Sequence, residues 1–466
     1  MTRWSPWLVV LAALVFRLAH LGDVHFVNPD GATYLRYDLL IYTQRLPLYP
    51  ILLHTLAALG LSMLTAGKLV AALCACAAIY VVTLIGGELA VGKRWTWVAA
   101  VSLAVDPLFA LHTVQPLTEG AFAFFAALAT WFALRLIRTE REFDLWGLVF
   151  CAGLSALTRA EGLVFAPLCL WGIVYVARRA GWLASFISLV LGLLPWVLFL
   201  VWQAAIVRRA GYLGEFGESV SASTMTGVLL HAALHLKSIA YHFGIVGVIP
   251  LFIGWRILRR ASRGWPRTRH HLWVLTYLLL TTWLGISIHW HFDLRFATPL
   301  IIWLSPIAGF GWQRILSGGP VTRRLGQALL VAQIVAWLVV SSAMIQQVGD
   351  LAADVSRAAE IAGQTSPQTP LVSDEQAMTS YYAGRVALPY RLPIRFRRAV
   401  VVLHDRYVDL HAERAKLERD FEVRELGSAF AQGAHGAAWR AVVWSISRRG
   451  SRAASVSTAP TTAPGG

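Results

Sequence analysis

Long apolar segments recur along the sequence from residue 5 to about residue 345, separated by short charged stretches. A helix needs about 20 mostly apolar residues to cross the hydrocarbon core of a bilayer. Charged residues make up only 14% of the chain, against about 25% in an average soluble domain. The sequence therefore predicts a polytopic, all-α membrane protein. We expect about eleven transmembrane helices, near residues 5–22, 67–90, 95–112, 118–137, 145–158, 161–177, 183–206, 240–258, 272–290, 297–313 and 326–345.

The distribution of Lys and Arg predicts how these helices are oriented. Basic residues concentrate in alternate loops, at 93–94, 135–141, 178–179, 256–269 and 314–324, and the opposite loops carry roughly half as many. The positive-inside rule then places the N-terminus in the cytoplasm and the loop "VNPDGATYL" at 27–35 outside. This bias and a basic tail account for the formal charge of +16, so no nucleic-acid partner is needed. A signal peptide at the N-terminus is the alternative, but no clear cleavage site follows its apolar run.

The chain changes character after residue 345. Short β-branched runs at 371–373 and 399–403 alternate with helix-like segments at 350–362 and 406–419. Residues 1–345 are thus expected to form the transmembrane domain, and residues 346–446 a small extracytoplasmic α/β domain. Residues 447–466 are rich in Ser, Ala, Pro, Thr and Gly, a composition that predicts a disordered tail.

Polar residues gather at the predicted outer ends of the helices. They could form a site on the extracytoplasmic face, because charged side chains near the bilayer core are costly and usually functional. The candidates for this site are Asp30, Tyr34, Arg45, Tyr49, Glu119, Arg159, Glu161, His291 and Arg295.

Each candidate also has a structural interpretation. Asp30 could cap a turn and Glu119 a helix N-terminus, while Arg159 and Glu161 could form only an ion pair. Arg45 and Arg295 could be interfacial anchors, and Tyr49 could belong to an aromatic belt. His289 and His291 could hydrogen-bond at a helix end or bind zinc with Asp293. Asp106 is expected to end a helix, and the four cysteines, at 74, 76, 151 and 169, to be buried core residues.

Several segments, in this order, resemble the GT-C superfamily of integral-membrane glycosyltransferases. They are Arg17 in "LVFRLAHLG", "PDGATYL", "LPLYPILLHTLAALG", "QPLTEGAFAFFAALATWFALR", "GLSALTRAEGLVFAPL" and "LRFATPLIIWLSPIAGFG". The branch with protein O-mannosyltransferases and the lipid A aminoarabinose transferase is the most similar. The resemblance implies a GT-C-like fold in the cytoplasmic (inner) cell membrane, with the active site on the extracytoplasmic side.

The resemblance also implies a reaction. The family's catalytic Asp in the first outer loop maps to Asp30, and the donor would be a sugar linked to a polyprenyl phosphate. Asp30 would act as the general base in an inverting transfer, because a phosphate leaving group departs as a stable anion and needs no general acid. Glu119 would assist, and Tyr34, Arg45, Tyr49, Arg159, Glu161, His291 and Arg295 would bind substrate. The acceptor would be a lipid, a glycan or a protein.

One departure from the family pattern and two rival functions bear on this interpretation. Many relatives carry a second carboxylate after the Asp, whereas here Gly31 follows it. No metal ligands are therefore assigned, and a divalent-cation requirement is left open. A membrane transporter or lipid flippase would need a polar path to the bilayer midplane, and the spans hold few central charges beyond Arg17. A non-catalytic scaffold of the cell envelope would not depend on Asp30.

Overall fold

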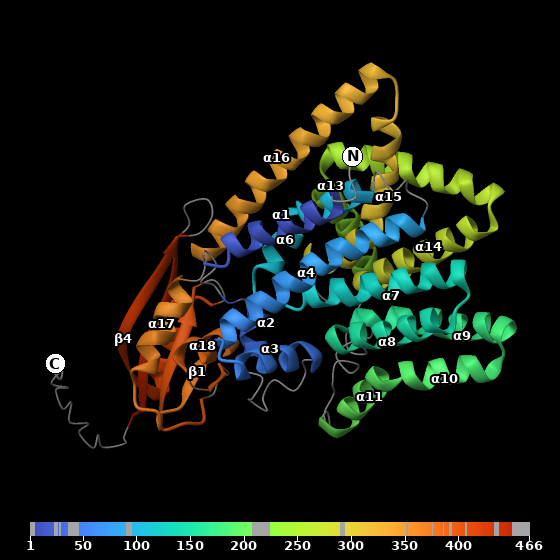
Figure 1. Ribbon diagram of the computed structural model, residues 1–466. Coiled ribbons are helices and arrows are strands. Elements are labelled where there is room, and N and C mark those ends of the chain that lie inside the picture. The colour runs from blue at the N-terminus through green and yellow to red at the C-terminus, as the bar shows by residue number, and fades with distance from the viewer. Residues whose placement is uncertain are drawn as a thin grey trace. The chain divides into compact units, whose positions relative to one another are not determined.

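The computed structural model describes residues 5–22, 27, 29–35, 46–89, 96–206, 224–288, 294–350, 353–374, 376–384, 386–390, 394–405, 408–432 and 438–449. The chain divides into two compact units, Met1–Val348 and Gly349–Gly466 (Figure 1). The first is built from helices, and the second combines helices with a sheet.

Helices of very different lengths make up the first unit. Their bounds are α1 Ser5–Ala19, α2 Pro29–Leu35, α3 Leu48–Ala58, α4 Met63–Glu88, α5 Thr96–Ala104, α6 Pro107–Thr113, α7 Glu119–Thr139, α8 Glu142–Thr158, η2 Ala160–Phe165, α9 Ala166–Ala180, α10 Trp182–Gly192, α11 Leu194–Ile206, α13 Met225–Gly264, α14 Pro266–Ser287, η3 Leu294–Ala297, α15 Thr298–Leu316 and α16 Pro320–Asp350.

Four helices of the described chain are long and apolar enough to cross a membrane, and six spans result if each of two bent pairs counts as one. The unit is thus a polytopic helical bundle, while the expected number of about eleven spans stays a prediction. The four cysteines are free; Cys76, Cys151 and Cys169 are buried and Cys74 is partly exposed.

Three predicted spans are interrupted in the structure. The predicted span 95–112 is two helices, α5 and α6, bent by 65°, because Pro107 starts a new helix that Asp106 caps. The predicted span 183–206 is divided into α10 and α11 at Leu193. The predicted span 240–258 lies within α13, which bends at Gly244, where φ is +62°. A positive φ is accessible to Gly at little cost, so the residue permits this bend.

The core of the first unit lies between α4, α5, α7, α8 and α15. Figure 1 shows α4 and α7 running side by side through it. Helices α13 and α15 approach so closely that a Cβ atom on Gly311 would lie 1.7 Å from the carbonyl oxygen of Pro250. Small residues at such crossings let helix backbones pack directly, as membrane bundles require. This packing fixes the framework that carries the connecting segments.

The second unit is a small α/β domain. Its elements are α17 Ala353–Gly363, β1 Leu371–Ser373, α18 Gln376–Ala383, β2 Ala387–Pro389, β3 Arg398–His404, α19 Leu410–Asp420, β4 Phe421–Gln432 and β5 Ala438–Arg448. The five strands form one sheet in the order β2-β1-β3-β5-β4. Strands β2, β1 and β3 are parallel, and β5 and β4 continue the sheet antiparallel.

Strand β3 shows why the sheet is covered on both faces. Val400 and Val402 pack against Ala358 and Ala362 of α17, while alternate residues of β3 face the side that holds Leu417 of α19. The predicted segments 371–373 and 399–403 correspond to β1 and β3. Strand β5 extends to Arg448, two residues into the segment predicted as a disordered tail, and residues 450–466 of that tail lie outside the described residues.

Candidate active site

The loop that carries Asp30 folds into the short helix α2. Pro29 begins the helix, and the hydroxyl of Thr33 donates a hydrogen bond of 2.6 Å to the Asp30 carbonyl oxygen. Gly31 packs against Pro116, so closely that a Cβ atom on Gly31 would lie 3.1 Å from the proline ring. The "PDG" sequence therefore packs directly against the chain segment that contains Pro116. Asp30 lies in the first turn of this helix, and its carboxylate is bound to an arginine.

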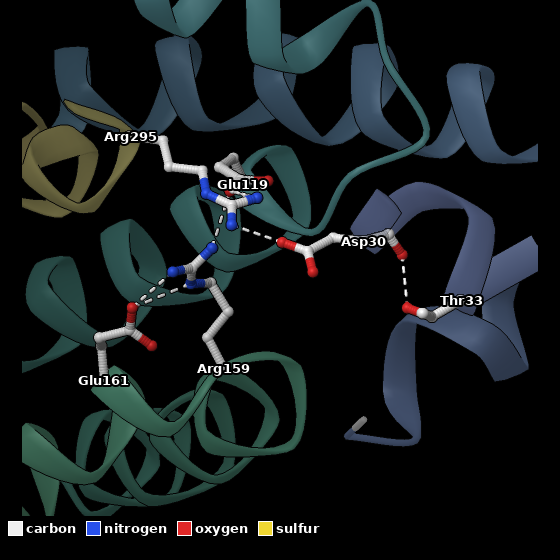
Figure 2. Close-up of polar contacts among 6 residues, drawn as sticks. All are labelled: Asp30, Thr33, Glu119, Arg159, Glu161 and Arg295. Carbon is white, nitrogen blue, oxygen red and sulfur yellow. Dashed lines mark hydrogen bonds and ion pairs between the residues drawn. The ribbon is translucent and has the colours of Figure 1, made fainter. Parts of the chain in front are cut away.

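Five charged side chains form a continuous chain of ion pairs (Figure 2). Asp30 Oδ2 lies 2.5 Å from Arg295 Nη2, and Arg295 Nη1 lies 3.9 Å from Glu119 Oε1. Arg159 Nη1 donates to that same Glu119 oxygen at 2.8 Å, and Arg159 Nη2 donates to Glu161 Oε1 at 2.6 Å. The two arginines thus lie between three carboxylates, and four separate segments of the chain contribute the five residues.

Burial differs along this chain of ion pairs. The exposed fraction of the side chain is 2% for Glu119 but 14% for Arg295 and 18% for Asp30. Both guanidinium groups also lie near the ring of Phe296, at 5.8 Å for Arg159 and 5.6 Å for Arg295, a cation–π arrangement. Glu119 is thus the buried centre, and Asp30 is the most exposed side chain of these five.

Two short 3₁₀ segments hold the arginines. Arg159 has an extended backbone between α8 and η2, and Gly162 turns the chain so tightly that its Cβ would lie 2.3 Å from the Ala156 nitrogen. Arg295 lies in η3, which packs against α6, α13, α14 and α15. Both cations are therefore fixed by loops that rest on the helical core.

The two tyrosines proposed for the site form its support. Tyr49 is fully buried, and its hydroxyl donates to the carbonyl oxygen of Gly67 at 2.9 Å. Tyr34 packs edge-to-face on Tyr49, with ring centroids 5.2 Å apart. A fully buried ring cannot belong to a lipid-facing aromatic belt, so that interpretation of Tyr49 is wrong. The pair instead joins α2 and α3 to the start of α4.

The structure thus unites five of the predicted residues, Asp30, Glu119, Arg159, Glu161 and Arg295. Arg159 and Glu161 form the ion pair that the structural interpretation expected, and Arg159 also reaches Glu119. Helix α7 begins at Glu119 as predicted, with the carboxylate bound to Arg159. The predictions for Arg45 and His291 fall outside the described residues.

Sequence reasoning missed Pro116 and Phe296. Pro116 also packs against Gly67, whose Cβ would lie 2.7 Å from it, so this proline spaces α2 from α4 beside Glu119. Its sequence signal was its place in "QPLTEG", directly before the acidic residue. Phe296 follows Arg295 directly and lies beneath both guanidinium groups.

The described residues contain no group of three or more His, Cys, Asp or Glu side chains that could hold a metal ion. His289, His291 and Asp293 lie outside them. Within the charged cluster the carboxylates are bound to arginines.

The helical unit and the small C-terminal sheet domain were compared as one chain with solved structures, and the similar ones include membrane enzymes that transfer sugars. The chain is similar to ArnT from Cupriavidus metallidurans, solved in the apo state and bound to undecaprenyl phosphate. The TM-scores are 0.63 and 0.61 with 14% identity, over 94% of this chain and 97% of ArnT.

It is also similar to the oligosaccharyltransferase AglB from Archaeoglobus fulgidus, with a TM-score of 0.58 and 12% identity over 84% of this chain and 65% of that one. No family model and no curated protein sequence matches the chain. The chain thus has the GT-C fold, and the resemblance seen in the sequence motifs is confirmed at that level.

Proposed function

We propose that this protein is a membrane glycosyltransferase that moves one sugar from a polyprenyl-phosphate carrier to an acceptor hydroxyl on the extracytoplasmic side of the cytoplasmic membrane. The observation that carries the proposal is the ion pair between Arg295 and Asp30, the most exposed side chain of the charged cluster, in a chain with a GT-C fold. Structures of similar proteins contain undecaprenyl phosphate, in ArnT, and dolichol phosphate, in AglB. The pair offers one base and one cation for such a donor.

Asp30 is the proposed general base. Its carboxylate takes the proton of the acceptor hydroxyl as that oxygen forms a bond to the anomeric carbon. The bond from this carbon to the phosphate oxygen breaks at the same time, and the polyprenyl phosphate leaves with the electron pair. Attack from the side opposite the phosphate inverts the anomeric centre. A positioned base of this kind contributes about 10²–10⁴-fold to the rate.

Arg295 is the proposed cation for the phosphate. A guanidinium binds phosphate with parallel hydrogen bonds and stays charged beside lipid. In this structure Arg295 is bound to Asp30 at 2.5 Å. A phosphate that attracts Arg295 would release the carboxylate, so the base becomes available when the donor is in place.

Glu119, Arg159 and Glu161 are proposed to hold Arg295. Counting the five charged groups, two guanidinium charges less three carboxylates give a formal charge of −1. A phosphate therefore needs Arg295 to move away from Asp30, or a further cation such as Arg45, which the sequence places in the adjoining loop. Glu119 and Arg159 remain paired during such a movement and keep Arg295 near the site.

The first test is donor consumption in isolated membranes that contain the protein. Undecaprenyl-phosphate donors with labelled mannose, glucose, galactose or 4-amino-4-deoxyarabinose would be offered separately, and the release of undecaprenyl phosphate measured. We expect loss of at least one donor above the level in membranes without the protein. If the folded protein consumes none of these donors and none of a wider set of polyprenyl-phosphate sugars, the glycosyltransferase proposal fails and a transport role is favoured.

Replacing Arg295 by Lys should raise the donor KM about tenfold, because a single ammonium replaces a planar bidentate donor. Steady-state kinetics over a range of donor concentrations would measure it. The matched control is Arg138→Lys, which changes an exposed arginine paired with Glu88. A donor KM that is the same in Arg295→Lys and in Arg138→Lys would remove Arg295 from phosphate binding.

A further inference from the structure

A second polar contact lies inside the helical unit, and the reaction proposed above does not use it. Asp106 Oδ2 lies 2.6 Å from His242 Nδ1, and both side chains have an exposed fraction of 0%. The carboxylate accepts this hydrogen bond. Because buried polar groups are costly unless they are paired, the contact joins α6 to α13 at a defined position.

Both partners lie where a helix is broken. Asp106 Oδ1 also accepts a hydrogen bond from the Phe109 backbone N–H at 2.6 Å and so starts α6 after the bend. His242 comes two residues before Gly244, the bend in α13. Backbone carbonyl groups next to a bend lose their helical partners. Here Trp337 of α16 donates to the carbonyl oxygen of His242 at 3.0 Å.

A third helix, α1, is bound to α6 by a polar contact. The side chain of Arg17 in α1 is fully buried, donates to the Thr113 hydroxyl at 2.9 Å, and lies over the ring of Phe109 at 5.4 Å. Helix α6 is thus held at its start by Asp106 and at its end by Thr113. Its position depends on these polar contacts as well as on apolar packing.

Helices α6 and α13 both pack against η3, the short segment that carries Arg295. Within η3, Phe296 and Ala297 are buried, so the segment rests on the helices beneath it. Helices α6 and α13, which the Asp106–His242 contact joins, thus support η3 together with α14 and α15.

We propose that Asp106 and His242 are positioning residues for Arg295. Their hydrogen bond fixes α6 against α13, and the two helices together support η3, so that Arg295 faces Asp30 and the donor phosphate. A hydrogen bond with strict geometry locates two broken helices better than a purely apolar contact, which permits sliding. This inference rests on the proposed glycosyltransferase function and adds two residues that contact no substrate.

The test is a double-mutant cycle on the donor KM. His242→Leu should raise this KM about tenfold, with a smaller change in kcat, and His242→Gln, whose amide can still donate, should recover most of it. In an Arg295→Ala background, His242→Leu should change the KM less than twofold, because residues that act through one group are not additive. Asp106→Asn retains an oxygen for the Phe109 N–H and provides the partner variant.

The matched control is His271→Leu, since His271 is also buried and contacts the Leu134 carbonyl oxygen at 3.1 Å. It lies 16 residues before the end of α14, about 24 Å along the helix. The control should leave the donor KM unchanged. Effects of His242→Leu and Arg295→Ala that multiply, or an equal KM change in the control, would overturn the positioning role. If His242→Leu does not fold, Asp106→Asn carries the same cycle, because its amide group no longer accepts the hydrogen bond from His242. A folded wild type that consumes no donor would remove the function and this inference together.

Discussion

Asp30→Asn should lower kcat for sugar transfer by about 10²–10⁴-fold, the usual contribution of a general base. Asn keeps the size of the side chain but cannot take a proton from the acceptor. It also cannot hold Arg295 as an ion pair, so Arg295 stays available to the phosphate and the donor KM should change less than about threefold. Release of polyprenyl phosphate in membranes with equal amounts of each protein would measure both constants.

The control for this variant is Glu88→Gln, which removes a carboxylate from the Arg138–Glu88 pair and should leave the rate unchanged. Gel filtration in detergent would show whether Asp30→Asn keeps its fold. If the folded variant retains more than about a third of the wild-type kcat, a factor far below the expected range, Asp30 is not the base. Loss of kcat with an equal loss of donor binding would instead assign Asp30 to binding.

Hydropathy located the long helices well because each one had to be apolar over its whole length. Helices α4, α7, α15 and α16 lie close to the predicted segments 67–90, 118–137, 297–313 and 326–345. The breaks were harder to predict. The run 95–112 is apolar on both sides of Asp106 and Pro107, and hydropathy does not record a change of direction. Here the chain changes direction because Asp106 and Pro107 start a new helix.

The C-terminal sheet shows a second limit of sequence reasoning. Strands β2, β4 and β5 were not predicted. Strands β2 and β4 lie at the edges of the sheet, and β4 has exposed residues such as Glu422 and Arg424. An edge strand needs only one partner and little apolar surface, so its sequence resembles a loop. Strands β1 and β3 lie inside the sheet and carry the β-branched runs that identified them, whereas β5 also lies inside the sheet and was missed.

The site residues were chosen by chemistry and by topology, and their mutual contacts came from the fold. Asp30 and Arg295 stood out as charges at predicted outer helix ends. They are far apart in the sequence, and no local sequence pattern predicts that they form an ion pair. His242 gave no signal, because a single histidine in an apolar segment looks the same whether or not it has a partner. Tyr49 stood out as an aromatic residue near the membrane surface, and only the structure shows its hydroxyl bound to Gly67.

Arg159→Leu should destabilise the folded protein by about 3–5 kcal/mol, the cost of removing one partner from a buried ion pair. Glu119 is 2% exposed and, among the ion pairs of the described residues, would keep the one with Arg295 Nη1, which is 3.9 Å away. A denaturant titration in detergent would measure the free energy of unfolding. The matched control is Arg138→Leu, because Arg138 is 52% exposed in its pair with Glu88. It should cost about 0–1 kcal/mol.

The double variant Arg159→Leu/Glu119→Gln separates stability from function. Removing the charge of Glu119 leaves no uncompensated buried carboxylate at that position, so a large part of the lost stability should return. The transfer rate should stay about 10²-fold below wild type, because Arg295 has lost the carboxylate that holds it and a misplaced phosphate ligand is costly. A double variant that recovers both stability and transfer would show that the cluster serves the fold alone. A stable Arg159→Leu would show that Glu119 is compensated by other groups.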